Sequence, residues 1–297
     1  MKVSVLILAH NEAANLPRCL SALSWCDDIV VIDSGSSDGG QEIAAQFGAR
    51  VLTRAFDDFA GQRNYGVAVG DFKHDWVLHL DADEVATPAF IAALEALPDD
   101  PPLDGYHLPS KLMIGERWLK HAGGYPTYQA RLGHRARFSF VQVGHGQREH
   151  PTARMGVFSE PYLHYNFSHG MRRWLEKHIR YAADEAALLG QATTNESEDA
   201  VSAFSRLGLR RRLKRLFGAL PLWLRPPLRF FHVLIVNQGF RDGAAGLAYA
   251  VMMAVYEGMI AVFAYEARFT REATAPERTA PEARSGAKPA TETKAAG

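Results

Sequence analysis

Short apolar runs alternate with helically spaced segments along the first 97 residues. Apolar residues dominate four runs, at positions 3–8, 29–32, 50–53 and 76–80. Such continuous runs are typical of strands buried on both faces of a sheet. Helices are predicted between them, with starts near Asn15, Asp38 and Gly61, and a further one starts at Thr87-Pro88. Strands that alternate with helices predict an α/β fold with a mainly parallel, right-handedly wound sheet.

The pattern is less regular beyond residue 97. Residues 105–109 fit a further strand, whereas residues 115–135 are rich in Gly, His, Tyr and Trp. This composition favours a long substrate-facing loop region over regular core. Helical spacing returns at residues 172–189. Residues 243–265 are then apolar except for Glu257, which is close to the length needed to span a bilayer.

Composition narrows the class of protein. Hydrophobic residues make up 47% and charged residues 22% of the 297 positions, as in a folded protein. The 33 basic and 33 acidic residues cancel, so net charge does not favour a nucleic-acid partner. Two cysteines indicate a reducing compartment without a disulfide scaffold. The first apolar run is too short for a secretory signal, so we expect a cytoplasmic protein.

An Asp-x-Asp string follows the fourth apolar run. Because side chains alternate along a strand, Asp81 and Asp83 are predicted to project from the same side at its carboxyl end. Ligands of open α/β sheets bind at this edge, and a hard divalent cation that also holds a diphosphate would bridge the two carboxylates. The alternative of a helix cap is disfavoured, since Thr87 fills that role. Chance remains an alternative, because such short strings are common.

Other polar residues follow the strands at the same edge. Asn11 and Glu12 come after the first run and would line a nucleotide pocket, while Asp33 ends the second run and can accept a hydrogen bond from a base imide. Arg63 fits either a bidentate phosphate contact or a surface position in the first turn of its helix. No glycine-rich dinucleotide or P-loop motif occurs. Side chains and a metal would therefore hold a nucleotide here.

Taken together, four motifs resemble those of family 2 glycosyltransferases, the inverting sugar-nucleotide enzymes with a GT-A fold. They are VLILAHNE at 5–12, VVIDSGSSD at 30–38, QRN at 62–64 and LDADE at 80–84. The segment GGYPTYQARL at 123–132 and His164-Tyr165 resemble the branch of lipopolysaccharide-core glucosyltransferases and related exopolysaccharide enzymes. The resemblance covers residues 3–190, and the C-terminal apolar part more loosely.

The resemblance implies roles for several residues. Asp33 would contact the base, and Asp83, with Asp81 nearby, would hold Mg²⁺ or Mn²⁺ on the diphosphate. Arg63 or Arg131 would meet the charge of the departing diphosphate. Gln129, together with Arg131, would shape the sugar or acceptor site.

Two departures from the family concern the second acid and the base. Ser34 stands where many members have a second aspartate, and the usual Glu-Asp pair that supplies the base is not found at its place. The branch has Val-His-Glu near this point, and the nearest match here is VGHGQREH at 143–150. Glu149 is therefore the candidate general base, and His145 a candidate metal ligand or orienting group. For both residues the alternative is a polar group on a surface loop.

These observations predict three regions. Residues 1–195 would form the GT-A catalytic domain, residues 196–270 a basic and apolar helical region, and residues 271–297 a disordered tail. Residues 206–229 contain eight basic residues and no acidic one. Basic residues before apolar helices favour peripheral docking on an anionic membrane. A membrane span, or a helical subdomain packed on the core, is the alternative.

We therefore expect a metal-dependent inverting enzyme that moves a hexose from a nucleotide sugar, with UDP as the expected nucleotide. The acceptor would be a lipopolysaccharide-core or lipid-linked saccharide at the inner face of the bacterial inner membrane. One rival is a sugar-1-phosphate nucleotidyltransferase, which would need a glycine-rich basic loop where Asn11 and Glu12 stand. The other is a catalytically inactive nucleotide-sugar-binding or scaffold protein.

Overall fold

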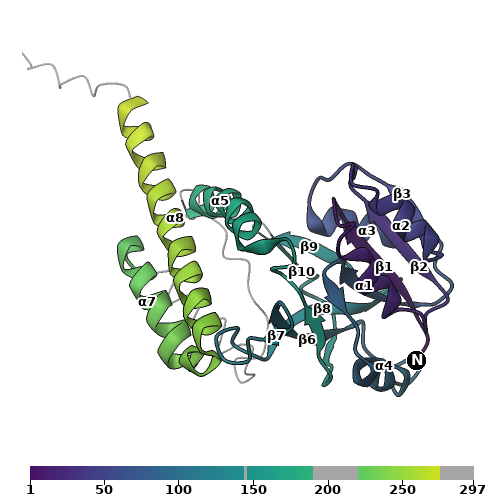
Figure 1. The fold of residues 1–297 in the computed structure, drawn as a ribbon. Coiled ribbons are helices and arrows are strands. Elements are labelled where there is room, and N and C mark those ends of the chain that lie inside the picture. Colours follow the sequence, from purple (N-terminus) through teal and green to yellow (C-terminus); the bar gives the residue numbers. More distant parts are fainter. Residues whose placement is uncertain (144–145, 190–219, 275–297) are drawn as a thin grey trace, which may run out of the picture.

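The structure is a computed structural model, which describes residues 1–143, 146–189 and 220–274 of the chain (Figure 1). Its first part contains β1 (Val3–Ala9), α1 (Leu16–Ser21), β2 (Ile29–Asp33), α2 (Gly40–Gln46), β3 (Arg50–Thr53), α3 (Phe59–Val69), β4 (Trp76–Asp81), β5 (Glu84–Val85) and α4 (Pro88–Glu95). The middle part contains β6 (Gly105–Ile114), β7 (Arg117–Trp118), β8 (Thr127–His134), β9 (Phe140–Val143), β10 (Gly146–Glu149), β11 (Met155–Val157), β12 (Tyr162–His164) and α5 (Gly170–Leu189). The last part contains a 3₁₀ turn (Leu222–Leu224), α7 (Arg225–Phe231), a π turn (His232–Val236), a second 3₁₀ turn (Gly239–Asp242) and α8 (Ala244–Thr274).

The prediction of an α/β fold with a parallel sheet is confirmed. Within the described residues, ten strands form one sheet whose main path is β3-β2-β1-β4-β8-β6-β12-β5. The first four strands of this path are parallel. From β4 onward the sheet is mixed, because β8 runs antiparallel to β4 and to β6. The hairpin β9–β10 is separate from this sheet.

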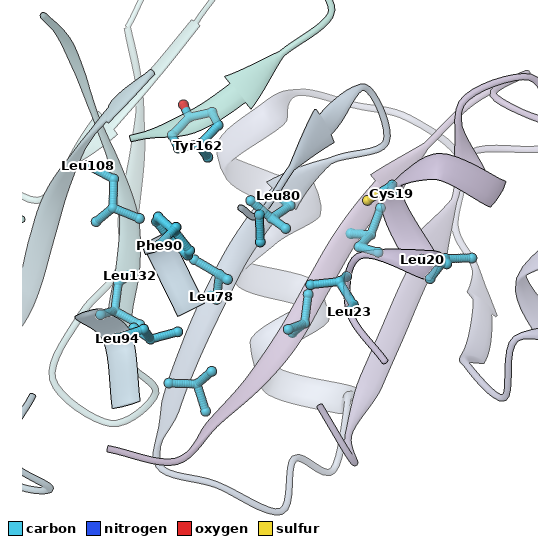
Figure 2. Packing of buried hydrophobic residues seen from close by; sticks show 14 of the residues in the cluster. Cys19, Leu20, Leu23, Leu78, Leu80, Phe90, Leu94, Leu108, Leu132 and Tyr162 are labelled. Atoms are coloured by element: carbon cyan, nitrogen blue, oxygen red, sulfur yellow. The ribbon is translucent and has the colours of Figure 1, made fainter. Parts of the chain in front are cut away.

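Strand β8 corrects the prediction that residues 115–135 form a loop region. Leu132 of β8 lies opposite Leu78 of β4 and is fully buried in the core, beside Leu108 of β6 (Figure 2). The strand carries too few β-branched residues to be recognised locally. Its stability comes from packing against strands distant in sequence.

Helices cover both faces of the parallel part of the sheet. On one face, Leu23, just after α1, and Phe90 of α4 pack over Leu78 and its neighbours (Figure 2). On the other face lies α3, where a Cβ added at Gly66 would approach Leu6 Cδ1 to 2.8 Å. Glycine therefore lets α3 approach β1 closely, and this proximity brings the first turns of α3 to the carboxyl ends of β2 and β4.

Helices α5, α7 and α8 lie together on the side of the molecule remote from β1–β3 (Figure 1). Asp242, just before α8, connects these helices to the segment between β7 and β8. Its Oδ2 accepts hydrogen bonds from the N–H groups of His121 and Ala122 at 2.9 and 2.8 Å. In the described part of the chain, one helix (Ala244–Phe269) is long and apolar enough to cross a membrane, judged by length and composition alone. That finding is weak evidence for a span.

Several predictions about the C-terminal region lie partly outside the described residues. Six of the eight basic residues of the 206–229 segment fall at 206–219, outside them. Of the tail predicted for residues 271–297, residues 271–274 end α8 and the remainder is outside the described part.

Candidate active site

Parallel strand register places the predicted site residues at one edge of the sheet. Ala9 of β1 lies opposite Asp33 of β2, and Leu8 lies opposite Asp81 of β4. The polar residues that follow these strands therefore meet at their carboxyl ends. This edge is where open α/β sheets bind ligands.

Asp33 organises the loop between β2 and α2. Its buried carboxylate accepts hydrogen bonds from the backbone N–H groups of Gly35 and Ser36, both at 2.9 Å, and from Gln41 Nε2 at 2.6 Å. The Ser36 hydroxyl donates to its second oxygen. Burial opposes ionisation, but these hydrogen bonds outweigh it and lower the pKa of Asp33. Base recognition by Asp33 stays a prediction. The loop that Asp33 shapes is the part of the structure on which this prediction rests.

Asn11 joins this loop to the end of β1. Its side-chain oxygen accepts the N–H of Ser37 at 2.9 Å, and its own N–H donates to Ser36 Oγ at 2.8 Å. The backbone of Asn11 has a φ of 55°, a left-handed conformation that asparagine tolerates better than most residues. Glu12 turns away from the loop, since its Oε2 accepts from Asn15 Nδ2 at 2.5 Å and lies 2.9 Å from His169 Nε2.

Asp81 ends β4 and divides its carboxylate between two arginines. Oδ1 accepts from Arg63 Nη2 at 2.6 Å, and Oδ2 accepts from Arg131 Nη2 at 2.5 Å. Arg131 Nη2 also donates to Glu84 Oε1 at 2.6 Å, and Glu84 Oε2 accepts the N–H of Asp81 at 2.9 Å. Burial opposes ionisation of Asp81, but the two guanidinium groups outweigh it and hold its pKa well below the usual range.

This cluster has consequences for the roles predicted for its members. The side chains of Arg63 and Glu84 are fully buried, and that of Arg131 is only 4% exposed. Arg63 is therefore not on the surface, and its buried guanidinium group is not accessible to a phosphate. It instead donates a hydrogen bond to the carboxylate of Asp81. Sequence reasoning missed Glu84, because a buried acid next to an Asp-x-Asp cannot be recognised without its arginine partner.

Asp83 lies outside β4, which corrects the prediction that Asp81 and Asp83 project from one face of the same strand. Strand β4 ends at Asp81, and Glu84 already belongs to β5, where it pairs with His164 of β12. Asp83 therefore lies in a tight turn, with its Oδ2 3.5 Å from His164 Nε2. Burial opposes the charged form of the imidazole, but Asp83, Glu84 and Asp81 outweigh it and raise the pKa of His164 to about 9.

The donor atoms around Asp83 bear on the predicted metal. No group of three or more His, Cys, Asp or Glu side chains in the described ranges is placed to hold an ion. Asp83 and His164 nevertheless form a pair of one carboxylate and one imidazole, and their side chains are 21% and 18% exposed. With its imidazole deprotonated, such a pair fits Mg²⁺ or Mn²⁺ that takes its other ligands from water and phosphate oxygens, so metal binding would release the proton of His164. The side chain of Asp81, 32% exposed, remains a predicted supporting ligand.

The three residues Gln62, Arg63 and Asn64 connect three parts of the site. Gln62 Nε2 donates to Ser34 Oγ at 3.0 Å, in the loop that Asp33 shapes. Arg63 pairs with Asp81, as described. Asn64 Nδ2 donates to the carbonyl of Phe140 and its Oδ1 accepts the N–H of the same residue, both at 2.9 Å. Successive side chains of α3 thus position the β2–α2 loop, the end of β4 and the β9–β10 hairpin.

A cavity of about 420 Å³ lies beside Asp81. Its lining residues come from α3, β4, β6, β8, β10 and α5, and they include Phe59, Asp81, His107, Tyr128, Gln129, Arg131, Arg148, Glu149 and Tyr181. Gln129 Oε1 accepts from the hydroxyl of Tyr162 at 3.3 Å, which fixes it in the wall. The cavity therefore brings together Asp81, Gln129, Arg131 and Glu149, four of the residues that the sequence singled out.

Glu149 ends β10 and reaches this cavity. Its backbone lies opposite Phe140, whose N–H and carbonyl groups both form hydrogen bonds with the Asn64 side chain. Glu149 Oε2 lies 3.3 Å from His107 Nε2, and the two side chains are 15% and 12% exposed. A carboxylate in such a place can accept a proton from a bound hydroxyl group. His145 lies outside the described residues.

Sequence reasoning missed His107, Lys177 and Tyr181. His107 is on β6, and its contact with Glu149 depends on the folding of two strands whose nearest ends are 32 residues apart along the chain. Tyr181 lies on α5 and lines the cavity. The only signal for Lys177 and Tyr181 is their four-residue spacing on one helix face, a pattern too common to indicate a site.

Comparison with known proteins identifies the first part of the chain. Residues 4–142 match the family model for "Glycosyl transferase family 2". A TPR repeat-containing protein of Synechococcus elongatus is 41% identical over 85 residues, which are 28% of this chain and 21% of that protein. An uncharacterized glycosyltransferase of Rickettsia felis is 34% identical over 84 residues, covering 28% of this chain and 29% of that one.

A third relative is the lipopolysaccharide core biosynthesis glycosyltransferase LpsC of Rhizobium meliloti, 32% identical over 89 residues, which cover 28% of this chain and 32% of LpsC. The chain thus spans between about a fifth and a third of the length of these relatives.

Two solved structures are similar in outline. TarS 1-349 of S. aureus in complex with UDP-GlcNAc has a TM-score of 0.46 and 15% identity, over 91% of this chain and 92% of that one. Glucosyl-3-phosphoglycerate synthase of Mycobacterium tuberculosis with Mn²⁺, UDP and glucosyl-3-phosphoglycerate has a TM-score of 0.45 and 16% identity, over 66% and 81%. The family match is the finding that identifies the domain, and the chain therefore carries a glycosyl transferase family 2 domain, as its motifs predict.

Proposed function

We propose that the protein is a metal-dependent inverting glycosyltransferase that moves a hexose from a nucleotide sugar, UDP-linked in the simplest case, to a saccharide hydroxyl. The observation behind this proposal is the cavity in which Asp81, Arg131 and Glu149 meet at the carboxyl edge of the sheet. Its volume of about 420 Å³ suits a sugar and part of its acceptor. The family 2 domain supports the same class of reaction.

The residues of the cavity divide the chemistry between them. Glu149 takes the proton of the acceptor hydroxyl while that oxygen attacks the anomeric carbon opposite the diphosphate. The bond from the anomeric carbon to the phosphate oxygen breaks, and its electron pair leaves with the diphosphate. Asp83 and His164 would hold Mg²⁺ or Mn²⁺, which supplies positive charge to the leaving group. Arg131 fixes Asp81 and Glu84 beside the reacting centre.

The acceptor class rests on sequence similarity and on the C-terminal helices. LpsC, a relative over 89 residues, is named for lipopolysaccharide core biosynthesis. We propose an acceptor of this kind, either a lipopolysaccharide-core or a lipid-linked saccharide, presented at the inner face of the bacterial inner membrane. An acceptor anchored in lipid requires an enzyme that can dock on the same surface.

Exposed apolar side chains on α7 and α8 support such docking. Eight large apolar residues of the described part of this region are more than half exposed: Trp223, Leu224, Phe231, Ile235, Val236, Phe240, Tyr265 and Phe269. Along α8, Leu247, Val251 and Val255 repeat every four residues and are each at least 45% exposed, so they form one apolar stripe. Glu257 is two residues from Val255 and therefore lies on another side of the helix. This arrangement favours α8 lying on a membrane surface over spanning it, and packing against a partner is the alternative.

Release of nucleoside diphosphate from a panel of nucleotide sugars tests the catalytic proposal. We expect wild-type protein to hydrolyse at least one donor, UDP-glucose among them, with Mg²⁺ or Mn²⁺ and not with EDTA. Glu149→Gln should lower kcat by about 10²–10⁴-fold with donor affinity kept. Turnover of a nucleoside triphosphate with a sugar 1-phosphate would instead identify a nucleotidyltransferase. Binding without any turnover would identify an inactive nucleotide-sugar-binding protein.

A further inference from the structure

Helix α5 contacts both α8 and the candidate active site. Trp174 and Met252 are buried together, and the rings of His178 and Tyr256 lie 5.1 Å apart, which fixes α5 against α8. Tyr181 continues this face of α5, with its ring 5.4 Å from that of His178, and lines the cavity. Lys177 precedes Tyr181 by one turn, and its Nζ lies 5.5 Å from the centre of the Tyr181 ring. The helix therefore presents a cation next to the cavity.

The arginines of the site are already engaged. Arg63 and Arg131 pair with Asp81, Arg131 also pairs with Glu84, and the two arginine side chains are 0% and 4% exposed. A phosphate that binds Nη2 of either arginine would separate a buried ion pair, which would cost several kcal/mol. A diphosphate that enters beside Asp81 and Asp83 would therefore be met by cations outside this cluster, among which are Arg148, a lining residue of the cavity, and Lys177.

Lys177 is suited to this role by position and exposure. Its side chain is exposed, and its Nζ lies next to the ring of Tyr181, which lines the cavity. Desolvation opposes its charged form, but Tyr181, Asp83 and Asp81 outweigh it and raise its pKa, so the ammonium group stays charged near neutral pH. A compact ammonium on a flexible stem is suited to a phosphate group.

We propose that Lys177 of α5 binds the diphosphate of the nucleotide-sugar donor. This inference rests on the proposed function, and it assigns the phosphate contact to α5 instead of to Arg63 of α3 and Arg131 of β8. Lys177 would neutralise charge that accumulates on the diphosphate as the bond to the sugar breaks. Because Lys177 is exposed, it can contact the ligand without breaking an internal ion pair.

Isothermal calorimetry of the full-length protein with Mg²⁺ and either UDP or uridine tests the proposal. Lys177→Met keeps most of the side-chain length and removes the charge. We expect it to raise the Kd for UDP on the order of tenfold, as for the loss of one charge-assisted hydrogen bond, and to leave uridine binding unchanged. Lys177→Arg should recover most of the affinity. Arg172→Met is the matched control, since Arg172 is an exposed cation on the same helix that pairs with Glu176 at 3.0 Å.

Two results would overturn the inference while the proposed function stands. The first is wild-type affinity for UDP in Lys177→Met, and the second is an equal loss for UDP and uridine, which would mean that Lys177 shapes the pocket without contacting phosphate. If wild-type protein binds none of UDP, GDP, ADP and TDP, the proposed function itself fails and this inference fails with it.

Discussion

At the scale of single residues, the two aspartates of the Asp-x-Asp string have different environments. Asp81 is held by Arg63 and Arg131, so its charge is needed to keep two buried guanidinium groups paired. Asp83 has His164 as its neighbour at 3.5 Å and a side chain open to the site. The first aspartate therefore contributes mainly to the fold, and the second is available to a ligand.

Substitution by asparagine should separate these two contributions. Asp81→Asn leaves two buried arginines facing a neutral group, and we expect it to lower the free energy of unfolding by about 3–5 kcal/mol. Asp83→Asn should leave stability nearly unchanged and abolish metal-dependent binding of UDP. Urea denaturation and calorimetry measure the two effects. Equal destabilisation by both substitutions, or full metal-dependent binding in Asp83→Asn, would contradict this assignment.

At the scale of secondary-structure elements, α3 aligns the parts of the site through its first turns. Asn64 makes two hydrogen bonds to the backbone of Phe140, and Phe140 lies opposite Glu149 in the β9–β10 hairpin. The hairpin is outside the main sheet, so the contact between Asn64 and Phe140 is a main determinant of the position of Glu149. The position of the candidate base is thus set by a helix distant from it in sequence.

Removing the Asn64 side chain should therefore affect catalysis more than binding. Asn64→Ala leaves the partly buried N–H and carbonyl of Phe140 without this partner, which should cost about 1–3 kcal/mol of stability. We expect kcat for donor hydrolysis to fall about tenfold or more with the Kd for UDP unchanged, because Glu149 shifts from its position. Val69→Ala, at the exposed end of the same helix, is the control. If the folded Asn64→Ala variant has the same kcat as wild type, Asn64 does not position Glu149.

The same elements show what the sequence can and cannot predict. Strands β1, β2 and β4 were predicted because each is a local run of apolar residues, and the edge where Asp33 and Asp81 meet follows from parallel winding. Strand β8 was missed because its burial depends on strands far away in sequence. The contacts of Glu149 with His107 and of Tyr181 with the cavity arise from long-range packing, and no local pattern contains that information.

At the scale of the whole molecule, the catalytic and C-terminal parts differ in how far they expose large apolar side chains. The α/β part buries its large apolar residues, whereas α7 and α8 expose a stripe of them. Eight basic residues occur at 206–229, next to this stripe in sequence. Each such residue contributes about 1 kcal/mol near an anionic surface, so four would raise partitioning roughly a thousandfold.

Co-sedimentation with vesicles of phosphatidylcholine and phosphatidylglycerol tests docking. Binding should require the anionic lipid and fall with salt. The double substitution Val251→Glu and Val255→Glu should weaken it at least about tenfold, because two side chains lose favourable burial. Phe47→Glu replaces an apolar side chain of similar exposure, 43%, at the residue that follows α2 and should have no effect. Binding that resists salt and alkaline extraction would indicate a span, and no lipid binding would favour a packed subdomain.

Helix α5 is shared between the two parts, and this sharing has a thermodynamic consequence. Its contacts with Met252 and Tyr256 of α8 and the place of Tyr181 in the cavity belong to one rigid element. If lipid shifts α8, it also shifts the groups that α5 presents to the donor, and the two binding equilibria become linked. Linkage is reciprocal: any factor by which a vesicle changes donor affinity is the factor by which bound donor changes affinity for the vesicle. An enzyme built in this way would hold its donor most tightly where its acceptor resides.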